Sequence, residues 1–273
     1  MLRKIKTLYA YLRTPSVPKR FLVRYAFAQI CAYVGIGTYI SFRTPHYKLF
    51  LTWSPVAMVA FGNPAQIREE EQILEGLLRP GDTVLDLGSN IGTWSLRAAG
   101  LVTETGRVYA FEAHPQTADI AKRNIKLNNF TNVTMVSSAL GNKEGSVTFS
   151  EDTYDDVNHV AEQGMGIVVP SMTLDSYAPL HSISRIRCIK LDVEGYERHV
   201  LEGAANIMAK TDFVIFEAYE PNCQRFGYSV RELFDWFSAR EFLLLDPLTK
   251  EAIDTEEAGQ LSVKNVLAQA RHH

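Results

Sequence analysis

The 273-residue chain has only three cysteines, and their number and spacing exclude two kinds of cross-linked fold. Cys31, Cys188 and Cys223 are odd in number and form no C-x-x-C pair, so neither a disulfide framework nor a zinc site is indicated. A reducing compartment is therefore expected. Internal repeats and low-complexity runs are absent as well. With 46% apolar residues, the chain can bury one sizeable core and still carry an extension.

Acidic residues are missing from the first 68 positions, although the net charge of the whole chain is −3. The basic residues of this stretch are Arg3, Lys4, Lys6, Arg13, Lys19, Arg20, Arg24, Arg43, Lys48 and Arg68. The remainder carries 18 basic and 31 acidic residues, a net charge of −13. A basic arm on an acidic body suggests contact with a polyanion, such as anionic lipid, a phosphorylated glycan carrier or nucleic acid. A solvated basic surface is the alternative.

Long uninterrupted apolar runs are also lacking. The uncharged stretch 25–42 is interrupted at Gln29, Gly35, Gly37 and Ser41, which makes it a weak candidate for a spanning helix. An interfacial helix, or a buried helix or strand, fits it better. No small-residue cleavage site marks a signal peptide. We expect a cytoplasmic protein, either free or held peripherally at the inner face of the membrane by its basic N-terminal region.

Two domains are expected, with residues 1–64 forming a basic, aromatic-rich extension and residues 65–273 forming the main body. In the extension, helices up to residue 45 should be followed by a hairpin or edge strands over 47–61. The body alternates apolar strand patterns with amphipathic helical ones. Strands are expected at 84–87, 107–111, 133–137, 146–149, 186–191, 213–216, 242–245 and 261–267, and helices at 67–78, 93–100, 115–128, 197–208 and 230–239. This alternation predicts an α/β fold with a mostly parallel sheet covered on both faces.

The stretch 83–95 reads T-V-L-D-L-G-S-N-I-G-T-W-S, a buried strand, a glycine turn and a helix start. Such a turn opens a nucleotide-binding βαβ unit, although an ordinary βα connection is the alternative. Between Gly88 and Gly92, Asn90 occupies the place of the middle glycine that lets a backbone approach a pyrophosphate. The G-K-[ST] of a phosphate-binding loop is absent too. An adenosine cofactor without a pyrophosphate fits better, and S-adenosylmethionine is the obvious candidate.

Glu112 follows the second strand, 26 residues after Asp86. A carboxylate at that strand end can accept hydrogen bonds from both ribose hydroxyls, although a surface glutamate is the alternative. Ser138 and Ala139, after the third strand, are placed to flank the adenine ring. The predicted cofactor contacts are Asp86, Gly88, Ser89, Asn90, Gly92, Glu112, Ser138, Ala139 and Asp192.

Five motifs together resemble the FkbM family of S-adenosylmethionine-dependent methyltransferases. They are D-L-G-S-N-I-G, V-Y-A-F-E, T-L-D-S, I-K-L-D-V-E-G-Y-E with L-E-G-A after it, and F-V-I-F-E. The resemblance covers about residues 66–268 and leaves the first sixty unexplained. It implies a class I methyltransferase fold, a Rossmann-like sheet of seven mostly parallel strands, and O-methylation of a sugar or natural-product hydroxyl. Ser89 and Trp94 stand where alanine and tyrosine are frequent in the family.

Carboxylates gather where the expected strands 186–191 and 213–216 end. Asp192 and Glu194 follow one strand and Glu217 ends the next. The three side chains should therefore lie close together at one edge of the sheet. Acids clustered in a crevice repel one another unless they share a cation or a proton. A divalent ion at these three residues would have the oxygen ligands that it prefers, but the cluster does not require one.

A sugar hydroxyl is a poor nucleophile, so a positioned base must take its proton during methyl transfer. Asp192 is the first choice, and Glu194 and Glu217 would orient the acceptor. His199 and His159 are alternative bases, although a lone histidine is usually a packed or solvent-exposed residue. Helix capping could account for Glu194 or Glu197.

The acceptor is expected to be a glycan or a hydroxylated natural product, read by the loops 151–165 and 219–228. An N-methyltransferase for nucleic acid or protein is the alternative that the basic arm suggests. Adenine N6 enzymes usually carry [DNS]-P-P-[YFW] where this chain has D-V-E-G, and no catalytic Pro-Cys appears. Nucleic acid is therefore not expected as a partner. A non-enzymatic binding or scaffolding role is the third hypothesis, and the sequence does not indicate an oligomeric state.

Overall fold

A computed structural model describes residues 19–62, 68–151, 158–161, 166–254 and 264–271. The chain forms two compact units, of which the first ends at Glu70 and the second begins at Glu71. Each unit is described on its own. The sequence-based division into domains at residue 64 stays a prediction. None of the described helices is long and apolar enough to cross a membrane.

The first unit packs two helices on a short hairpin. Its elements are α2 (Lys19–Tyr33), the 3-10 helix η1 (Gly37–Tyr39), β1 (Ser41–Arg43), β2 (Lys48–Phe50) and α3 (Pro55–Gly62). Its small core is formed by Ala28, Cys31, Leu51 and Met58. A hairpin is present, with β1 antiparallel to β2, but it pairs residues 41–43 with 48–50 instead of lying within 47–61. The expectations of a helix at 41–43 and of a strand at 55–61 are wrong.

Residues 55–62 form helix α3 where a strand was expected, because Ser54 and Pro55 favour the start of a helix. The N–H of Met58 donates to the carbonyl oxygen of Ser54 at 3.0 Å, the first intrahelical bond. Proline is well tolerated at the first helical position, where its missing N–H has no partner to lose. The β-branched and aromatic composition of 55–62 indicated strands, yet burial of the helix in the unit's own core decides the outcome.

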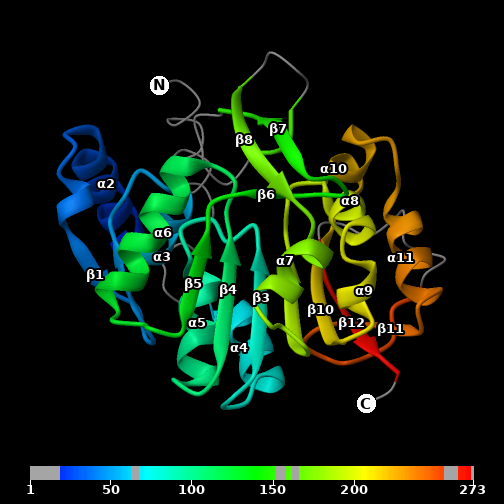
Figure 1. Ribbon diagram of the computed structural model, residues 1–273. Coiled ribbons are helices and arrows are strands. Elements are labelled where there is room, and N and C mark those ends of the chain that lie inside the picture. Colours follow the sequence, from blue (N-terminus) through cyan, green and yellow to red (C-terminus); the bar gives the residue numbers. More distant parts are fainter. Residues whose placement is uncertain (1–18, 63–67, 152–157, 162–165, 255–263, 272–273) are drawn as a thin grey trace. The chain divides into compact units, whose positions relative to one another are not determined.

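The second unit is built on a seven-stranded sheet with the order β11-β12-β10-β9-β3-β4-β5 (Figure 1). Its strands are β3 (Thr83–Leu87), β4 (Arg107–Phe111), β5 (Val133–Val136), β9 (Ile186–Leu191), β10 (Thr211–Ala218), β11 (Phe242–Leu245) and β12 (Lys264–Ala270). Only β12 runs against its neighbours. This arrangement confirms the predicted class I methyltransferase sheet. The parallel strands β3, β4, β9 and β10 bring their carboxyl ends to one edge.

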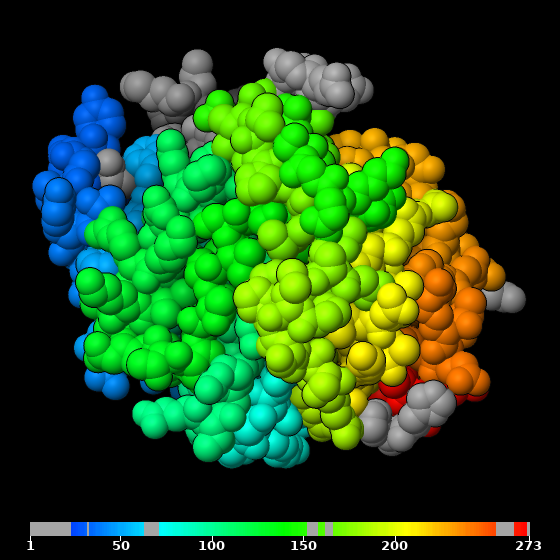
Figure 2. All heavy atoms as spheres, viewed as in Figure 1, coloured from blue at the N-terminus to red at the C-terminus, as the bar shows by residue number. Residues whose placement is uncertain are grey.

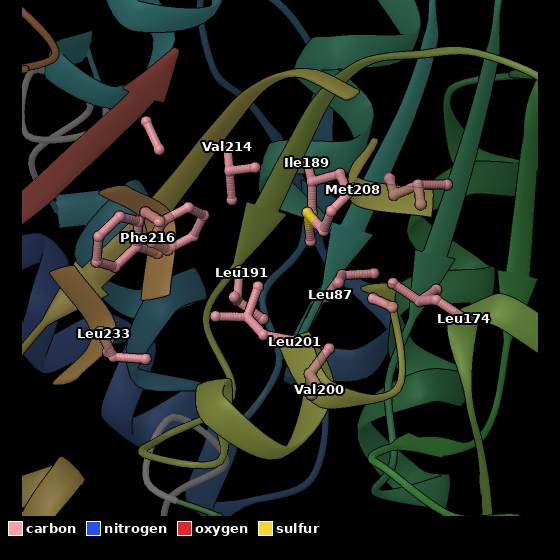
Figure 3. Packing of buried hydrophobic residues seen from close by; sticks show 14 of the residues in the cluster. Leu87, Leu174, Ile189, Leu191, Val200, Leu201, Met208, Val214, Phe216 and Leu233 are labelled. Atoms are coloured by element: carbon pink, nitrogen blue, oxygen red, sulfur yellow. The ribbon is translucent and has the colours of Figure 1, made fainter. Parts of the chain in front are cut away.

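Helices cover both faces of this sheet, as the sequence predicts. One face packs against α4 (Arg68–Leu77) and α5 (Thr93–Val102). The other packs against α7 (Leu174–Leu180), α8 (Glu197–Glu202), α9 (Ala205–Met208) and α11 (Val230–Ser238), where Leu191, Leu201 and Phe216 are among the fully buried residues (Figure 3). The remaining helices are α6 (Pro115–Leu127) and α10 (Glu220–Arg225).

The expected single helix over 197–208 is two helices, because Gly203 interrupts it. A Cβ at this glycine would lie 2.0 Å from the carbonyl oxygen of Gly141, so the two backbones touch. Glycine is required for that close approach.

A second, three-stranded sheet has the order β6-β8-β7 and stands beyond the carboxyl edge of the main sheet in Figure 1. Its strands are β6 (Ala139–Leu140), β7 (Gly145–Phe149) and β8 (Ile167–Met172). With α7, β7 and β8 (green to yellow-green) occupy the middle of the face that Figure 2 shows. The sequence predicted only β7. Most of the loop expected at 151–165 lies outside the described residues.

Candidate active site

The glycine turn after β3 is held by the ends of two neighbouring strands. The N–H groups of Gly88 and Ser89 both donate to the carbonyl oxygen of Phe111, at 3.0 and 2.8 Å. A Cβ on Gly88 would lie 1.8 Å from the carbonyl oxygen of Asp192, and its φ of 82° also favours glycine. The turn therefore joins the carboxyl ends of β3, β4 and β9 into one backbone surface.

Asn90 and Gly92 complete the turn through their backbone conformations. Both have positive φ, at 48° and 87°, and Gly92 precedes the first residue of α5. The N–H of Gly92 donates to the carbonyl oxygen of Ser89 at 2.8 Å. The turn is thus a closed loop that ends at a helix N-terminus.

Glu112 lies directly after β4 and is buried. One carboxylate oxygen accepts from the N–H of Asn90 at 2.9 Å, and the other accepts from the N–H of His114 at 2.9 Å. A carboxylate offers about four acceptor sites and no donor. The side chain is therefore fixed in one orientation beside the glycine turn, where the sequence places a ribose.

Asp86 is completely buried within β3. Its Oδ2 accepts from the hydroxyl of Ser95, in the first turns of α5, whereas Oδ1 has no hydrogen-bond partner. Burial raises the pKa of Asp86, and the nearby positive charge of Lys190 opposes this shift. This hydrogen bond connects Asp86 to the start of α5, the helix that directly follows the glycine turn.

Ser138 and Ala139 are both buried where the small sheet begins. The Oγ atom of Ser138 lies 2.9 Å from the carbonyl oxygen of Pro170 in β8, so this hydroxyl holds β6 and β8 together. The Oγ of Ser137 is buried and has no hydrogen-bond partner. Ser137 is not among the cofactor contacts predicted from the sequence, although it directly precedes Ser138, which is.

Asp192 follows β9, and its carboxylate is paired with a lysine. The Nζ atom of Lys190 lies 2.9 Å from Oδ2 of Asp192. Lys190 also faces Asp86 across the sheet in the register of β3 and β9. The sequence analysis missed Lys190, although a lysine inside an apolar strand, two positions before an acid, would place both side chains on one face.

Glu194 is half-buried in the loop after β9, and its backbone has a φ of 53°. Asn222 Nδ2 donates to Oε2 of Glu194 at 3.1 Å, and Arg225 donates to its carbonyl oxygen at 3.2 Å. Burial, and then the negative charges of Asp192 and Glu217, raises the pKa of Glu194 to about 8. The three predicted acids therefore influence one another electrostatically at one edge of the sheet.

Glu197 closes the loop that carries Glu194. Its Oε1 accepts from the N–H groups of Val193 and Gly195, at 3.0 and 3.3 Å, and its Oε2 accepts from the Tyr228 hydroxyl at 3.1 Å. These are the bonds of a structural residue, but they close the loop before α8 and do not cap that helix, the role considered from the sequence.

The two histidines considered as bases have other surroundings. The ring of His199 is stacked on that of Tyr196, with 4.1 Å between their centroids, and burial lowers the pKa of His199. His159 contacts Ser150, whose Oγ accepts from the N–H of His159 at 3.1 Å. Within the described residues, no group of three or more His, Cys, Asp or Glu side chains could hold a metal ion.

The strand order, the glycine turn and the fixed carboxylate after β4 define a class I methyltransferase domain. Residues 86–244 match the sequence model described as Methyltransferase FkbM domain. The match covers more than half of the chain, and the chain belongs to this family.

Several named proteins are similar to this chain. The hexuronic acid methyltransferase AglP of Haloferax volcanii is 28% identical over 158 residues, which are 56% of this chain and 64% of AglP. The match thus spans less than two thirds of that relative. The 2-O-methyltransferase NoeI of Sinorhizobium fredii is 21% identical over 202 residues, 67% of this chain and 82% of NoeI. An rRNA methylase structure from Streptococcus thermophilus superposes with a TM-score of 0.45 at 16% identity, covering 75% of this chain and 96% of the other.

S-adenosylmethionine is the cofactor of such a domain, and the residues present suit it. Glu112 supplies an oriented acceptor for a diol. A sulfonium cation is stabilised by negative charge nearby, which Asp192 and Glu217 can provide. Two buried oxygen atoms have no hydrogen-bond partner. They are Oδ1 of Asp86 in β3 and Oγ of Ser137, directly after β5.

Proposed function

We propose that this protein transfers a methyl group from S-adenosylmethionine to a hydroxyl of a sugar. The acceptor would be a polysaccharide, an oligosaccharide, a glycolipid or a glycosylated natural product. The observation that carries the proposal is Glu194, a half-buried carboxyl group of raised pKa between two further acids. The names of the similar proteins AglP and NoeI, a hexuronic acid methyltransferase and a 2-O-methyltransferase, agree with it.

When bound, the cofactor supplies an electrophilic methyl group. The acceptor oxygen forms a bond to that methyl carbon while the carbon–sulfur bond breaks, and the hydroxyl proton must pass to a base. Alignment of the oxygen with the methyl group contributes much of the rate. The protein therefore has to orient the hydroxyl and to accept one proton.

Glu194 is the base that we propose. A general base is most effective when its pKa lies near the working pH, and the pKa of about 8 meets this condition. Asp192, the first choice from sequence alone, has its Oδ2 engaged by a hydrogen bond from Lys190. Asp192 and Glu217 would then orient acceptor hydroxyls. His199 keeps no part in this scheme, since its ring packs against Tyr196.

The cofactor site that we propose centres on Glu112, with the backbone of Gly88, Ser89, Asn90 and Gly92 around it. Asp86 would be a positioning residue, since its Oδ2 is bound to Ser95. Ser138 would position this part of the site through its hydrogen bond to the carbonyl oxygen of Pro170. Ala139 would offer apolar surface to the adenine ring.

The test is methyl transfer from radiolabelled S-adenosylmethionine to fractionated glycans, lipids, RNA and protein, followed by replacement of Glu194. We expect label in a carbohydrate fraction, and a loss of kcat of roughly 10²- to 10⁴-fold in Glu194→Gln. The matched control is Glu104→Gln, at an exposed glutamate in a turn. An active enzyme in which Glu194→Gln and Glu104→Gln behave alike would remove Glu194 as the base. Label found only in RNA or protein would overturn the proposed acceptor.

A further inference from the structure

Exposed apolar side chains are concentrated in one short segment of the first unit. Among the described residues, eleven large hydrophobic side chains are exposed, and seven of them lie within residues 23–39. The seven are Val23, Phe27, Ile30, Tyr33, Val34, Ile36 and Tyr39. Single exposed apolar residues are common and need no explanation, but a contiguous group of this kind marks an interaction surface.

The spacing of these residues places them on one side of helix α2. Val23, Phe27, Ile30 and Val34 are separated by four, three and four positions, the repeat of a single helical stripe. The N–H of Val34 donates to the carbonyl oxygen of Ile30 at 3.0 Å, so the helical geometry continues to that residue. We name these four residues the apolar stripe. Its exposed fractions include 70% for Val23 and 62% for Ile30.

The opposite side of α2 already supplies the core of its own unit. Ala28 and Cys31 are buried there against Leu51 and Met58. On the other side, Phe27 contacts the ring of Phe61, with 6.2 Å between the ring centroids, but remains 48% exposed. The helix therefore has two apolar sides, of which one is only partly used within the unit. The apolar stripe is left to another partner.

The charge of the unit indicates what that partner is. Residues 19–62 contain Lys19, Arg20, Arg24, Arg43 and Lys48 and no acid. Arg43 and Lys48 are exposed and stand opposite each other in the β1–β2 hairpin. A unit that carries exposed cations and exposed apolar side chains is complementary to an anionic lipid surface, which presents phosphates at its outer face and hydrocarbon below them.

We propose that α2 lies in the plane of an anionic membrane surface, with the apolar stripe inserted between the lipid headgroups and the basic residues on the phosphates. The helix has 15 residues and does not qualify as a membrane span, so it would lie on the bilayer rather than cross it. An acidic protein would satisfy the charges but would need a hydrophobic groove as well, whereas a bilayer supplies both. This inference does not depend on the acceptor of the methyl group.

The test is sedimentation of the full chain with lipid vesicles. We expect retention on vesicles of phosphatidylcholine containing about one third phosphatidylglycerol, weaker retention on phosphatidylcholine alone, and a decrease when salt is raised. The double variant Ile30→Asp, Val34→Asp should lower the partition coefficient by roughly tenfold or more, because two charges replace two inserted apolar side chains. The matched control is Leu180→Asp, Leu248→Asp, at two exposed leucines of the second unit.

Several outcomes would overturn the proposal. Wild-type protein that stays in the supernatant with anionic vesicles would do so, as would equal retention of the two double variants. A dimer in sedimentation velocity that the stripe variant abolishes, without vesicle binding by the wild type, would assign the stripe to a second copy of the chain. If the double variant fails to fold by circular dichroism, the single variant Val23→Asp takes its place. The salt and lipid dependence of the wild type needs no variant.

Discussion

Glu194 joins an unusual backbone conformation to an unusual acid–base property. Its φ of 53° turns the chain directly after β9, so that the side chain stands among Asp192, Glu217 and Asn222. The neutral form of Glu194 avoids repulsion from the other acids. Ionisation costs free energy, because the half-buried carboxylate loses part of its hydration. The same surroundings that make it a poor acid make it a strong base near neutral pH.

A first prediction concerns the pH dependence of the reaction. Because the pKa of Glu194 is raised to about 8, the base is mostly protonated below that value and ionised above it. The rate of methyl transfer should therefore rise with pH through about 8 and level off beyond. Glu194→Gln should lose this rise along with most of its activity, whereas Glu104→Gln should keep both. Initial rates measured from pH 6 to about 10 would show it, and a wild-type profile that is flat across pH 8 would speak against Glu194.

A second prediction concerns stability at the same residue. An unfolded glutamate ionises near 4.5, whereas folded Glu194 keeps its proton until about 8. Between these values the folded state binds more protons, so this group's contribution to the free energy of unfolding falls as pH rises. Above about 8 the contribution is fully lost. Melting temperatures of wild type and Glu194→Gln should thus separate in favour of the variant as pH rises from 5 to 9, and a constant difference would contradict the assignment.

Glu112 gives a third prediction, on cofactor affinity. Its two oxygens accept backbone N–H groups of Asn90 and His114, and Gln in its place would turn an N–H₂ group toward one of these donors. Hydrogen bonds to charged groups are worth about 1.5–3 kcal/mol. Glu112→Gln should therefore weaken S-adenosylmethionine binding by roughly tenfold to hundredfold in calorimetry. Glu104→Gln is the control, and unchanged affinity in Glu112→Gln would remove Glu112 from the site.

At the scale of elements, the close contact between the turn after β3 and the end of β9 yields a fourth prediction. A Cβ at Gly88 would meet the carbonyl of Asp192 at 1.8 Å, whereas a Cβ at Gly227 would meet nothing within 4 Å. Both glycines have similar positive φ, 82° and 76°, so the comparison separates overlap from backbone strain. Gly88→Ala should lower the free energy of unfolding by more than about 2 kcal/mol, and Gly227→Ala by about 1 kcal/mol. Equal losses in denaturant unfolding would mean that the two strand ends are not packed as described.

Strands and helices with a strong period were predictable from the sequence. β4, β9 and β11 have the predicted bounds, because each is a short, mostly apolar run between turn residues. The small sheet was not predictable to the same degree. β8 contains Pro170, which has no N–H for a ladder, and β6 has two residues whose only signal is their pairing with β8. Such elements depend on contacts between distant segments.

The site was predictable where a side chain's position follows from a strand end. Asp192, Glu194 and Glu217 could be placed at one edge because parallel strands end together. Their individual roles could not be, because these depend on neighbours that the spacing does not reveal. Lys190 pairs with Asp192, Asn222 with Glu194, and Glu197 with backbone N–H groups.

At the scale of the whole molecule, charge is divided between the two units. The second unit carries the excess of acid and the methyltransferase domain, and the first carries cations and the apolar stripe. A catalytic unit with its own attachment to an anionic surface would work on acceptors held at that surface. The two properties can be separated by experiment, because the stripe and the carboxylates lie on different units.

The most direct test of the central claim is a methyl-transfer assay with a chemical analysis of the product. Purified protein, radiolabelled S-adenosylmethionine and fractionated glycans are incubated, and the labelled product is treated with mild alkali before hydrolysis to monosaccharides. A methyl ether on a sugar hydroxyl survives alkali, whereas a methyl ester is cleaved. The account predicts alkali-stable label on a monosaccharide, reduced strongly in Glu194→Gln and retained in Glu104→Gln. Label that alkali releases, or label confined to RNA or protein, would contradict it.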